Sequence, residues 1–325
     1  MMKIHAVTVT RNGGPEVLAL EERELGDPGP GQVRIRARAC GVNYIDVYFR
    51  TGLYPRPVPY VAGLEGAGEV EAIASDVHGL APGDRVAWWS VPGSYASGVL
   101  APAASVVRVP EGVSDATAAA AMLQGMTAHY LAHGVRETRR GDVALVHAAA
   151  GGTGLLLVQL LKAAGVTVIG TCSTADKEGL VRGAGADHVI RYTETDFAPA
   201  LREWTRGRGA DVVYDSVGKT TFDGSLASLR PRGLLVLFGQ SSGPVPPFDL
   251  GRLNTMGSLF VTRPTLANYA QDRAELELRA GAVFDAIAAG GLAVRIGAEF
   301  PLARAADAHR ALEGRATTGK VLLRP

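Results

Sequence analysis

The chain has 325 residues, more than one hydrophobic core ordinarily supports, so we expect two domains. Hydrophobic residues make up 47% of it and charged residues 20%, proportions typical of a soluble globular enzyme. The formal net charge of +1 offers no basic surface for nucleic acid or an anionic membrane, and neither partner is expected.

The cysteine count and the N-terminus indicate a cytoplasmic protein. Cys40 and Cys172 are far apart in the sequence, which is no disulfide framework and is typical of a reducing compartment. The first residues enter strand-like sequence without a signal segment, and no apolar run is long enough to span a bilayer.

The first third of the chain predicts a β-rich domain. Alternating apolar and polar residues, separated by Gly and Pro turns, are typical of antiparallel strands that bury one face. A short helix and a loop interrupted by three prolines lie among them, which together describe a partly closed barrel. The predicted strands are 3–9, 17–24, 32–39, 66–73 and 85–89, and the helix is 44–50.

A helix capped at Ser114 and continuing to His133 leads into a βαβ unit over residues 141–171. Its turn has the form Ala149-x-Gly151-x-x-Gly154, with Gly152 between. Such glycines let the backbone approach a pyrophosphate and let helix and strand pack closely, while the helix N-terminus attracts the anion. The alternative is a turn without a ligand, but the strand before it and the helix after it favour nucleotide binding.

Further α/β elements complete a doubly wound sheet. Six parallel strands with helices between them are typical of a Rossmann fold. After Arg263 the pattern changes to a long helix over 267–289, then a strand, a helix and a last strand at 320–323. The remaining predicted helices are 175–182 and 197–205, and the remaining strands are 188–191, 211–214, 233–238 and 258–261.

The central run resembles the quinone oxidoreductase and zeta-crystallin branch of the medium-chain dehydrogenase/reductase superfamily. The residues that carry the resemblance are Gly141-Asp142-x-x-Leu145-x-x-x-Ala149-Ala150-Gly151-Gly152-x-Gly154-x-x-x-x-Gln159-x-x-Lys162, with Val213-Tyr214-Asp215-Ser216-Val217-Gly218 and Arg315-Ala316-Thr317-Thr318-Gly319-Lys320 further on. The resemblance implies a GroES-like substrate domain over 1–125, completed by 265–325, and a Rossmann domain over 126–264 inserted into it. It also implies an active site in the cleft between the domains.

The resemblance raises the question of a metal, because many relatives in the superfamily use a catalytic zinc. Such a site needs about three protein ligands. Where the zinc-dependent relatives have Cys, His and Cys, this sequence has Asn43, Leu64 and Gln124, and it lacks the four-cysteine structural lobe. Glu65 alone is more typical of a structural hydrogen-bond acceptor, so we expect no metal.

Without a metal or a nucleophilic triad, the reaction left is hydride transfer from a nicotinamide. We therefore predict NADPH-dependent reduction of a quinone or related carbonyl compound. A quinone needs no strong acid, because its reduced product is a stabilised anion. One alternative is reduction of the double bond of an enone or alkenal. Another is an NADPH-binding protein with an RNA-binding or structural role, as in some relatives.

The resemblance also indicates site residues. It places Asn43 beside the nicotinamide and Tyr54 at the pocket for the acceptor, whereas Tyr48 is as well explained as a wall residue. The predicted catalytic set is Asn43, Tyr54 and Thr127, and Gln124 is a further polar candidate. The predicted cofactor residues are Asn43, Tyr48, Thr127, Gly151, Gly152, Thr153, Gly154, Ser173, Lys177, Tyr192, Ser216, Phe238, Gly239, Ser241, Arg263 and Arg315. His129, His133 and His147 are interpreted as packing residues.

The choice of NADPH rests on the end of the second Rossmann strand. An NAD site usually has an acidic residue there, but this chain has Ser173. Ser173 can donate to a 2′-phosphate, and Lys177 brings a positive charge one turn later. Tyr192 matches a family position that touches the same phosphate. Asp176 adds a negative charge, which a capping box Ser173-x-x-Asp176 would turn toward the backbone.

A homodimer is predicted through residues 257–262, a short apolar strand at the sheet edge. Leu259 and Val261 are expected at the interface. The alternative is that a loop of the same chain covers this edge.

Overall fold

The computed structural model describes residues 2–325, which cluster into two compact units. The first unit runs to Met126 and resumes over Ala270–Pro325, and the second unit is Thr127–Tyr269. The chain therefore leaves the first unit, forms the second and returns. The sequence predicts domain boundaries at 125/126 and 264/265.

Within the described part of the first unit, the strands form two sheets. The smaller has the order β2-β1-β4, and the larger has the order β15-β16-β3-β5-β6-β8 with β7 also paired to β3. The end strands of the larger sheet, β15 and β8, do not pair with each other, as expected for a partly closed barrel. The strands are β1 (Met2–Val9), β2 (Leu18–Leu25), β3 (Gln32–Val42), β4 (Tyr60–Val61), β5 (Glu65–Ile73), β6 (Arg85–Trp88), β7 (Gly98–Pro102), β8 (Val107–Arg108), β15 (Ile296–Pro301) and β16 (Lys320–Arg324).

Strand β3 shows why the sequence folds in this way. Its apolar residues Val33 and Ile35 are fully buried, whereas Arg36 and Arg38 on the other face form ion pairs with carboxylates of β5. One face thus packs into the core and the other meets water, which is the reason for the alternating pattern.

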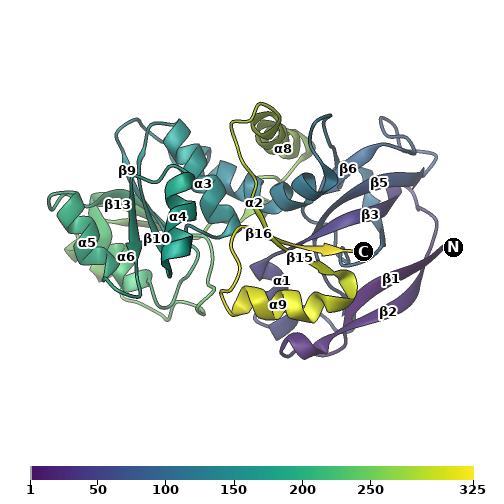
Figure 1. Ribbon diagram of the computed structural model, residues 1–325, viewed down its shortest axis with the longest axis horizontal. Helices are drawn as coiled ribbons and strands as arrows, with labels where there is room; N and C mark the ends of the chain where they lie inside the picture. The colour runs from purple at the N-terminus through teal and green to yellow at the C-terminus, as the bar shows by residue number, and fades with distance from the viewer. Residues whose placement is uncertain (1) are drawn as a thin grey trace. The chain divides into compact units, whose positions relative to one another are not determined.

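The helices of the first unit are α1 (Tyr44–Thr51), α8 (Arg273–Ala288) and α9 (Ala305–Glu313). Helix α9 lies beside α1 (Figure 1), and the buried Arg50 of α1 makes a 2.8 Å ion pair with Glu313 of α9. The predicted helix over 267–289 was wrong at its start. The carboxylate of Asp272 accepts a hydrogen bond from Glu275 N at 2.9 Å, and this cap begins α8 at Arg273.

Helix α2 (Asp115–His133) runs from one unit into the other. Its predicted cap is confirmed, because Ser114 Oγ accepts from Thr117 N at 3.1 Å. Its alanines over 118–121 are completely buried, which explains why the helix is apolar around its circumference. No helix among residues 2–325 combines the length and the apolar character needed to cross a membrane.

The second unit is a parallel sheet of six strands in the order β11-β10-β9-β12-β13-β14. Figure 1 shows α3 and α4 on one side of the sheet and α5 and α6 on the other, so the doubly wound prediction is confirmed. Helices α6 and α7 were not predicted. The elements are β9 (Val143–Val146), α3 (Gly152–Ala163), β10 (Thr167–Cys172), α4 (Ala175–Gly183), β11 (His188–Arg191), α5 (Phe197–Trp204), β12 (Ala210–Asp215), α6 (Phe222–Ser228), β13 (Leu229–Leu237), α7 (Gly251–Thr255) and β14 (Phe260–Thr262).

Candidate active site

The turn between β9 and α3 is built for close backbone approach. A Cβ atom on Gly154 would lie 2.5 Å from Ala148 O and 2.8 Å from Ala149 Cα, so only glycine fits there. Gly151 is the N-cap of α3, and no acidic residue lies in the first helical turn. The first N–H groups of α3, from Gly152 onward, have no carbonyl partner within the helix. The turn therefore has the close backbone approach and the open helix N-terminus that a pyrophosphate site would need.

The ends of β10 and β11 bring Ser173 and Tyr192 to one edge of the sheet. Tyr192 N donates to Cys172 O at 3.1 Å, and Thr193 Oγ1 donates to Ser173 O at 2.9 Å. The predicted capping box of Ser173 is wrong. Thr174 is the N-cap of α4 and accepts from Lys177 N at 3.4 Å, so Lys177 is the third residue of the helix. Ser173 thus lies before the cap.

Asp215, at the end of β12, organises the next loop. It is completely buried, and its carboxylate accepts from Val217 N at 2.7 Å, Gly218 N at 3.0 Å and Ser225 Oγ at 2.8 Å. Its backbone carbonyl accepts from Phe238 N at 2.9 Å, and Ser241 N donates to Ser216 O at 3.1 Å. The structure therefore brings together the predicted cofactor residues Ser216, Phe238, Gly239 and Ser241. Asp215 itself is not among the predicted site residues.

His147 is a packing histidine, as predicted. Its Nδ1 lies 3.1 Å from Thr171 Oγ1 and its Nε2 lies 3.1 Å from Ser225 Oγ. Because Ser225 donates its hydrogen to Asp215, Nε2 of the histidine must be the donor to Ser225. Burial lowers the pKa of His147, which favours this neutral form. His133, by contrast, is exposed at the end of α2 and is not a core residue.

In the first unit, Asn43 lies in a buried polar cluster with Glu65 and Lys320. The three side chains are 3%, 0% and 1% exposed. Lys320 forms an ion pair with Glu65, and its Nζ donates to Asn43 Oδ1 at 2.7 Å. The other carboxylate oxygen of Glu65 accepts from Leu123 N of α2 at 2.6 Å. No sequence pattern pointed to Lys320 beyond its place in the closing motif.

The amide of Asn43 is fully used by this cluster. Its Oδ1 also accepts from Gln124 Nε2 at 3.3 Å, and its Nδ2 donates to Glu65 Oε2 at 2.7 Å and to Gly41 O at 3.5 Å. An ammonium can only donate and a carboxylate can only accept. Lys320 and Glu65 therefore determine which end of the Asn43 amide is the oxygen and which is the nitrogen.

The predicted aromatic residues lie together on and after α1, the helix that Asn43 caps. The ring centroids of Tyr48 and Tyr54 are 5.1 Å apart, and Tyr54 N donates to Tyr48 O at 3.0 Å. Tyr48 is buried, and Tyr54 is half-buried and also meets the ring of Phe49. Tyr54 is thus the more accessible of the two tyrosines.

The predicted site residues divide between the two units. Thr127, on α2, is 8% exposed, and Arg263 follows β14. The residues in the first unit are Asn43, Tyr48, Tyr54, Gln124 and Arg315, and those in the second are Thr127, Gly151, Gly152, Thr153, Gly154, Ser173, Lys177, Tyr192, Ser216, Phe238, Gly239, Ser241 and Arg263.

The donor set around Asn43 does not fit a metal ion. Two carboxylates lie beside Asn43, but Glu65 is already paired with Lys320, and Asp46 accepts from Asn43 N and from the Tyr95 hydroxyl. Leu64 has no donor atom, and the amides of Asn43 and Gln124 are weak ligands for zinc. Elsewhere in residues 2–325, no group of three or more His, Cys, Asp or Glu could hold a metal.

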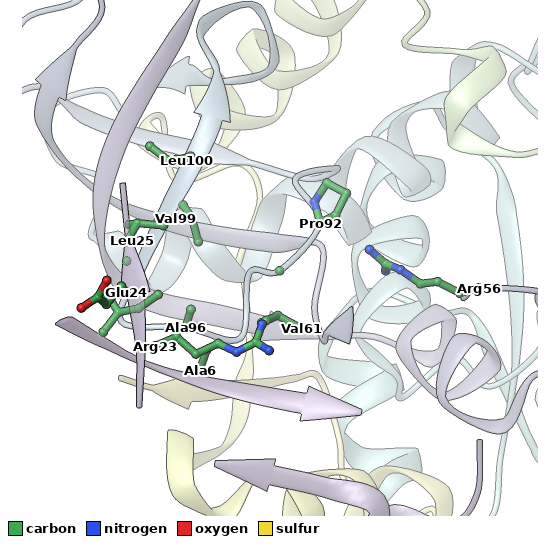
Figure 2. Close-up of a pocket in the computed structure, with 13 residues that line it drawn as sticks. Ala6, Arg23, Glu24, Leu25, Arg56, Val61, Pro92, Ala96, Val99 and Leu100 are labelled. Atoms are coloured by element: carbon green, nitrogen blue, oxygen red, sulfur yellow. The ribbon is translucent and has the colours of Figure 1, made fainter. Parts of the chain in front are cut away.

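A pocket of about 320 Å³ lies against the smaller sheet (Figure 2). Ala6, Val61 and Val99 form apolar parts of its wall, and Arg23 and Arg56 bring charge to it. None of the predicted site residues lines this pocket, so it is separate from the groups described above.

Comparisons with known proteins agree over nearly the whole chain. Residues 29–111 match the family of the alcohol dehydrogenase GroES-like domain, and residues 184–323 match a family described as zinc-binding dehydrogenase. A quinone oxidoreductase of Pseudomonas aeruginosa is 46% identical over 96% of this chain and 97% of its own. A 2-haloacrylate reductase of Burkholderia sp. is 42% identical over 99% of each chain. The structure of Escherichia coli quinone oxidoreductase complexed with NADPH aligns with a TM-score of 0.97 at 42% identity, over 99% of this chain and 100% of that one.

Proposed function

Since this chain belongs to the quinone oxidoreductase family of medium-chain dehydrogenases/reductases, we propose that it reduces quinones with NADPH and without a metal. The observation that carries this proposal is the glycine cradle at the start of α3, where a Cβ on Gly154 would meet the backbone at 2.5 Å. Such a cradle suits the pyrophosphate of a dinucleotide. The Escherichia coli relative is described as complexed with NADPH, which supports the same cofactor here.

The end of β10 supports NADPH over NADH. Ser173 provides a hydroxyl where an acidic residue would repel a 2′-phosphate, and it lies beside Tyr192 at the ends of adjacent strands. Lys177 adds a positive charge in the first turn of α4, close to the helix N-terminus, which itself favours an anion. We propose that Ser173, Lys177 and Tyr192 bind this phosphate.

The bound nicotinamide would supply the hydride. We propose that Asn43 and Thr127 border the nicotinamide and that Tyr54, backed by Tyr48, forms the wall against which a flat acceptor stacks. The remaining cofactor contacts would come from the loop that Asp215 holds, together with Arg263 and Arg315. A reduced quinone is a stabilised anion that takes a proton from water, so these residues need only position the acceptor.

Reduction of an activated carbon–carbon double bond is the second candidate. The 42% identity to a 2-haloacrylate reductase favours it, because that relative is named for an acid with such a bond. Steady-state oxidation of NADPH with a panel of quinones and enones, followed by product analysis, separates the two reactions. Turnover of quinones supports the first proposal, and turnover of enones alone supports the second.

A third reading is a protein that binds NADPH without important turnover and has an RNA-binding or structural role. The formal net charge of +1 argues against RNA. A lack of turnover in the substrate panel, together with a salt-dependent shift of RNA in a gel, would favour it.

We also propose a cytoplasmic homodimer that pairs through β14. In the structure Leu259 is buried against the core of its own unit, and Val261 packs against the same core. The expectation that Leu259 faces a partner was therefore wrong, because its side chain is buried, whereas Val261 stays half-buried. Phe260 is 60% exposed at the sheet edge, and we assign the contact to it. Cys40 and Cys172 are free thiols, which suits a reducing compartment.

A further inference from the structure

We propose that Lys320 is a positioning residue of the active site, and that its ammonium, held by Glu65, sets the orientation of the Asn43 amide in place of a metal ion. This inference rests on the proposed function, which places Asn43 and Tyr54 beside the reacting groups. Lys320 is separated from Asn43 by 277 residues in the sequence, and only the fold brings them together.

Four elements converge on the cluster of Asn43, Glu65 and Lys320. Lys320 is the first residue of β16, Glu65 is the first residue of β5, and Asn43 is the N-cap of α1. Helix α2 joins the cluster through Leu123 N, which donates to Glu65, and through Gln124 Nε2, which donates to Asn43. One buried cation therefore fixes the start of α1 relative to β5, β16 and α2.

Stability alone is a weak reason for such a pair. Taking an ammonium and a carboxylate out of water costs about as much as their attraction returns, and apolar replacements are often neutral. Burial lowers the pKa of Lys320, and the charge and hydrogen bond of Glu65 oppose that effect. The Lys320–Glu65 pair instead has a geometric effect, because it strongly favours one orientation of the Asn43 side-chain amide over the flipped orientation.

The orientation follows from the donors and acceptors. Lys320 Nζ lies 2.7 Å from Asn43 Oδ1, and Glu65 Oε2 lies 2.7 Å from Asn43 Nδ2. A flipped amide would place N–H groups against the ammonium and the carbonyl oxygen against the carboxylate, so both contacts would become repulsive. Without Lys320, Asn43 Oδ1 loses its 2.7 Å bond and keeps the longer bond from Gln124, at 3.3 Å.

The same residue connects the cluster to the proposed acceptor wall. Asn43 N donates to Asp46 in the first turn of α1 at 2.9 Å, and the next turn carries Tyr48, which meets Tyr54. Loss of the lysine would therefore loosen both the amide and the beginning of the helix that supports this wall.

The Lys320 ammonium lies among the positions that hold the zinc ligands in zinc-dependent relatives. In zinc-dependent relatives the ligands stand where this chain has Asn43, Leu64 and Gln124. Here Lys320 contacts Asn43 and also Glu65, which follows Leu64 in the sequence. Gln124 donates to the same Asn43 oxygen as Lys320 does. The chain thus supplies its own cation among the positions of the missing ligands.

The test removes the pair without leaving a buried charge. Lys320→Met alone would strand the Glu65 carboxylate, so the informative protein is the double variant Glu65→Gln/Lys320→Met. We expect it to fold and to bind NADPH within about twofold of the wild type, with kcat lower by about ten- to a hundredfold because the reacting groups are misplaced. The matched control is Arg324→Met, which removes a cation from the same strand but from an exposed pair with Glu299, and should keep kcat.

A second measurement does not depend on activity. In the wild type, the side-chain amide protons of Asn43 should exchange with solvent at least about a hundredfold more slowly than those of Asn254, which is exposed. In the double variant that protection should fall, whereas in Arg324→Met it should remain. NMR of the side-chain amides, assigned with Asn43→Asp, gives both values.

The outcomes separate the two proposals. A wild type that oxidises NADPH with neither quinones nor enones contradicts the proposed function, and the exchange measurement still tests Lys320. A folded double variant with wild-type kcat, or with unchanged amide protection, overturns the positioning role. If the double variant does not fold, fast exchange of the Asn43 amide in the wild type overturns the proposal and slow exchange supports it.

Discussion

His309 and Tyr95 meet in the core of the first unit, with His309 Nε2 3.1 Å from the tyrosine hydroxyl oxygen. Tyr95 donates to Asp46 Oδ2 at 2.9 Å, so its oxygen accepts from the imidazole N–H. Arg50 Nη1 lies 3.4 Å from the other ring nitrogen, which therefore has no hydrogen and acts as the acceptor. The ring is neutral, and burial, with the nearby Arg50 charge, lowers the pKa of His309 to about 3.

The first prediction is that His309 makes the protein acid-sensitive. The pKa of the histidine is 6.5 in the unfolded reference state and about 3 when folded. Its contribution to the free energy of unfolding is therefore present above pH 6.5 and is lost as the pH falls toward 3. The slope is at most about 1.4 kcal/mol per pH unit. Urea unfolding at several pH values should show that His309→Asn has a flatter dependence there than the wild type.

Asp46 also contributes to the pH dependence of stability. Burial raises the pKa of Asp46 to about 7, so its contribution gives the free energy of unfolding a pH slope of the opposite sign. The comparison must therefore use the difference between wild type and variant, in which the Asp46 slope largely cancels. Parallel curves for the two proteins would contradict the assignment to His309.

The second prediction concerns the cofactor. Lys177→Ala should weaken NADPH binding by roughly 1–3 kcal/mol, which is about ten- to a hundredfold, and leave NADH nearly unchanged. The reason is that only NADPH carries the 2′-phosphate that the lysine would pair with. Fluorescence titration with each cofactor measures both affinities. Equal losses for the two, or a wild type that prefers NADH, would mean that the end of β10 has been misinterpreted.

The third prediction concerns the glycine cradle. Gly154→Ala should lower the free energy of unfolding by roughly 1–3 kcal/mol and weaken NADPH binding at least about tenfold, because the added methyl group meets Ala148 O at 2.5 Å. The matched control is Gly179→Ala in α4, where a Cβ meets nothing within 4 Å. That change should stabilise the helix by about 0.5–1 kcal/mol. Thermal melts and cofactor titration compare the two, and equal effects would refute the steric argument.

The fourth prediction concerns the edge strand. Phe260→Lys should convert a dimer to a monomer, because it puts a charge on the exposed edge of β14. Leu278→Lys in α8 is the control, since Leu278 is 63% exposed and Phe260 is 60% exposed. Light scattering gives the mass of each protein. An unchanged mass for Phe260→Lys, or dissociation by both changes, would move the interface elsewhere.

The fifth prediction is that chelators leave the activity unchanged. The carboxylate of Glu65 is already paired with Lys320, and its neighbours Asn43 and Gln124 offer only amides. Assays before and after dialysis against a chelator, with elemental analysis of the active protein, provide the check. Stoichiometric zinc in the active enzyme would disprove it.

The sequence by itself predicted most of the elements and their order, because hydrophobic period and turn residues act over a few positions. Short elements such as β4, β7, β8, α6 and α7 were missed. The run over residues 141–171 was predicted as strand, glycine turn, helix and strand, and it forms β9, α3 and β10. The need for glycine at position 154 also follows from such local geometry. Local patterns were less certain at element ends: the cap of α4 is Thr174 and not Ser173, and α8 begins six residues later than predicted, at Arg273.

Tertiary structure decided the contacts between distant residues and the direction of each side chain. Lys320 meets Asn43 across 277 residues and His309 meets Tyr95 across 214, and no periodicity encodes such a pairing. At the start of β14 the fold buried Leu259 and left Phe260 exposed, because successive side chains of extended chain point to opposite faces and the register decides which face is buried. Buried polar groups must find partners wherever the fold brings them, so the cluster around Asn43 exists only once four elements have converged.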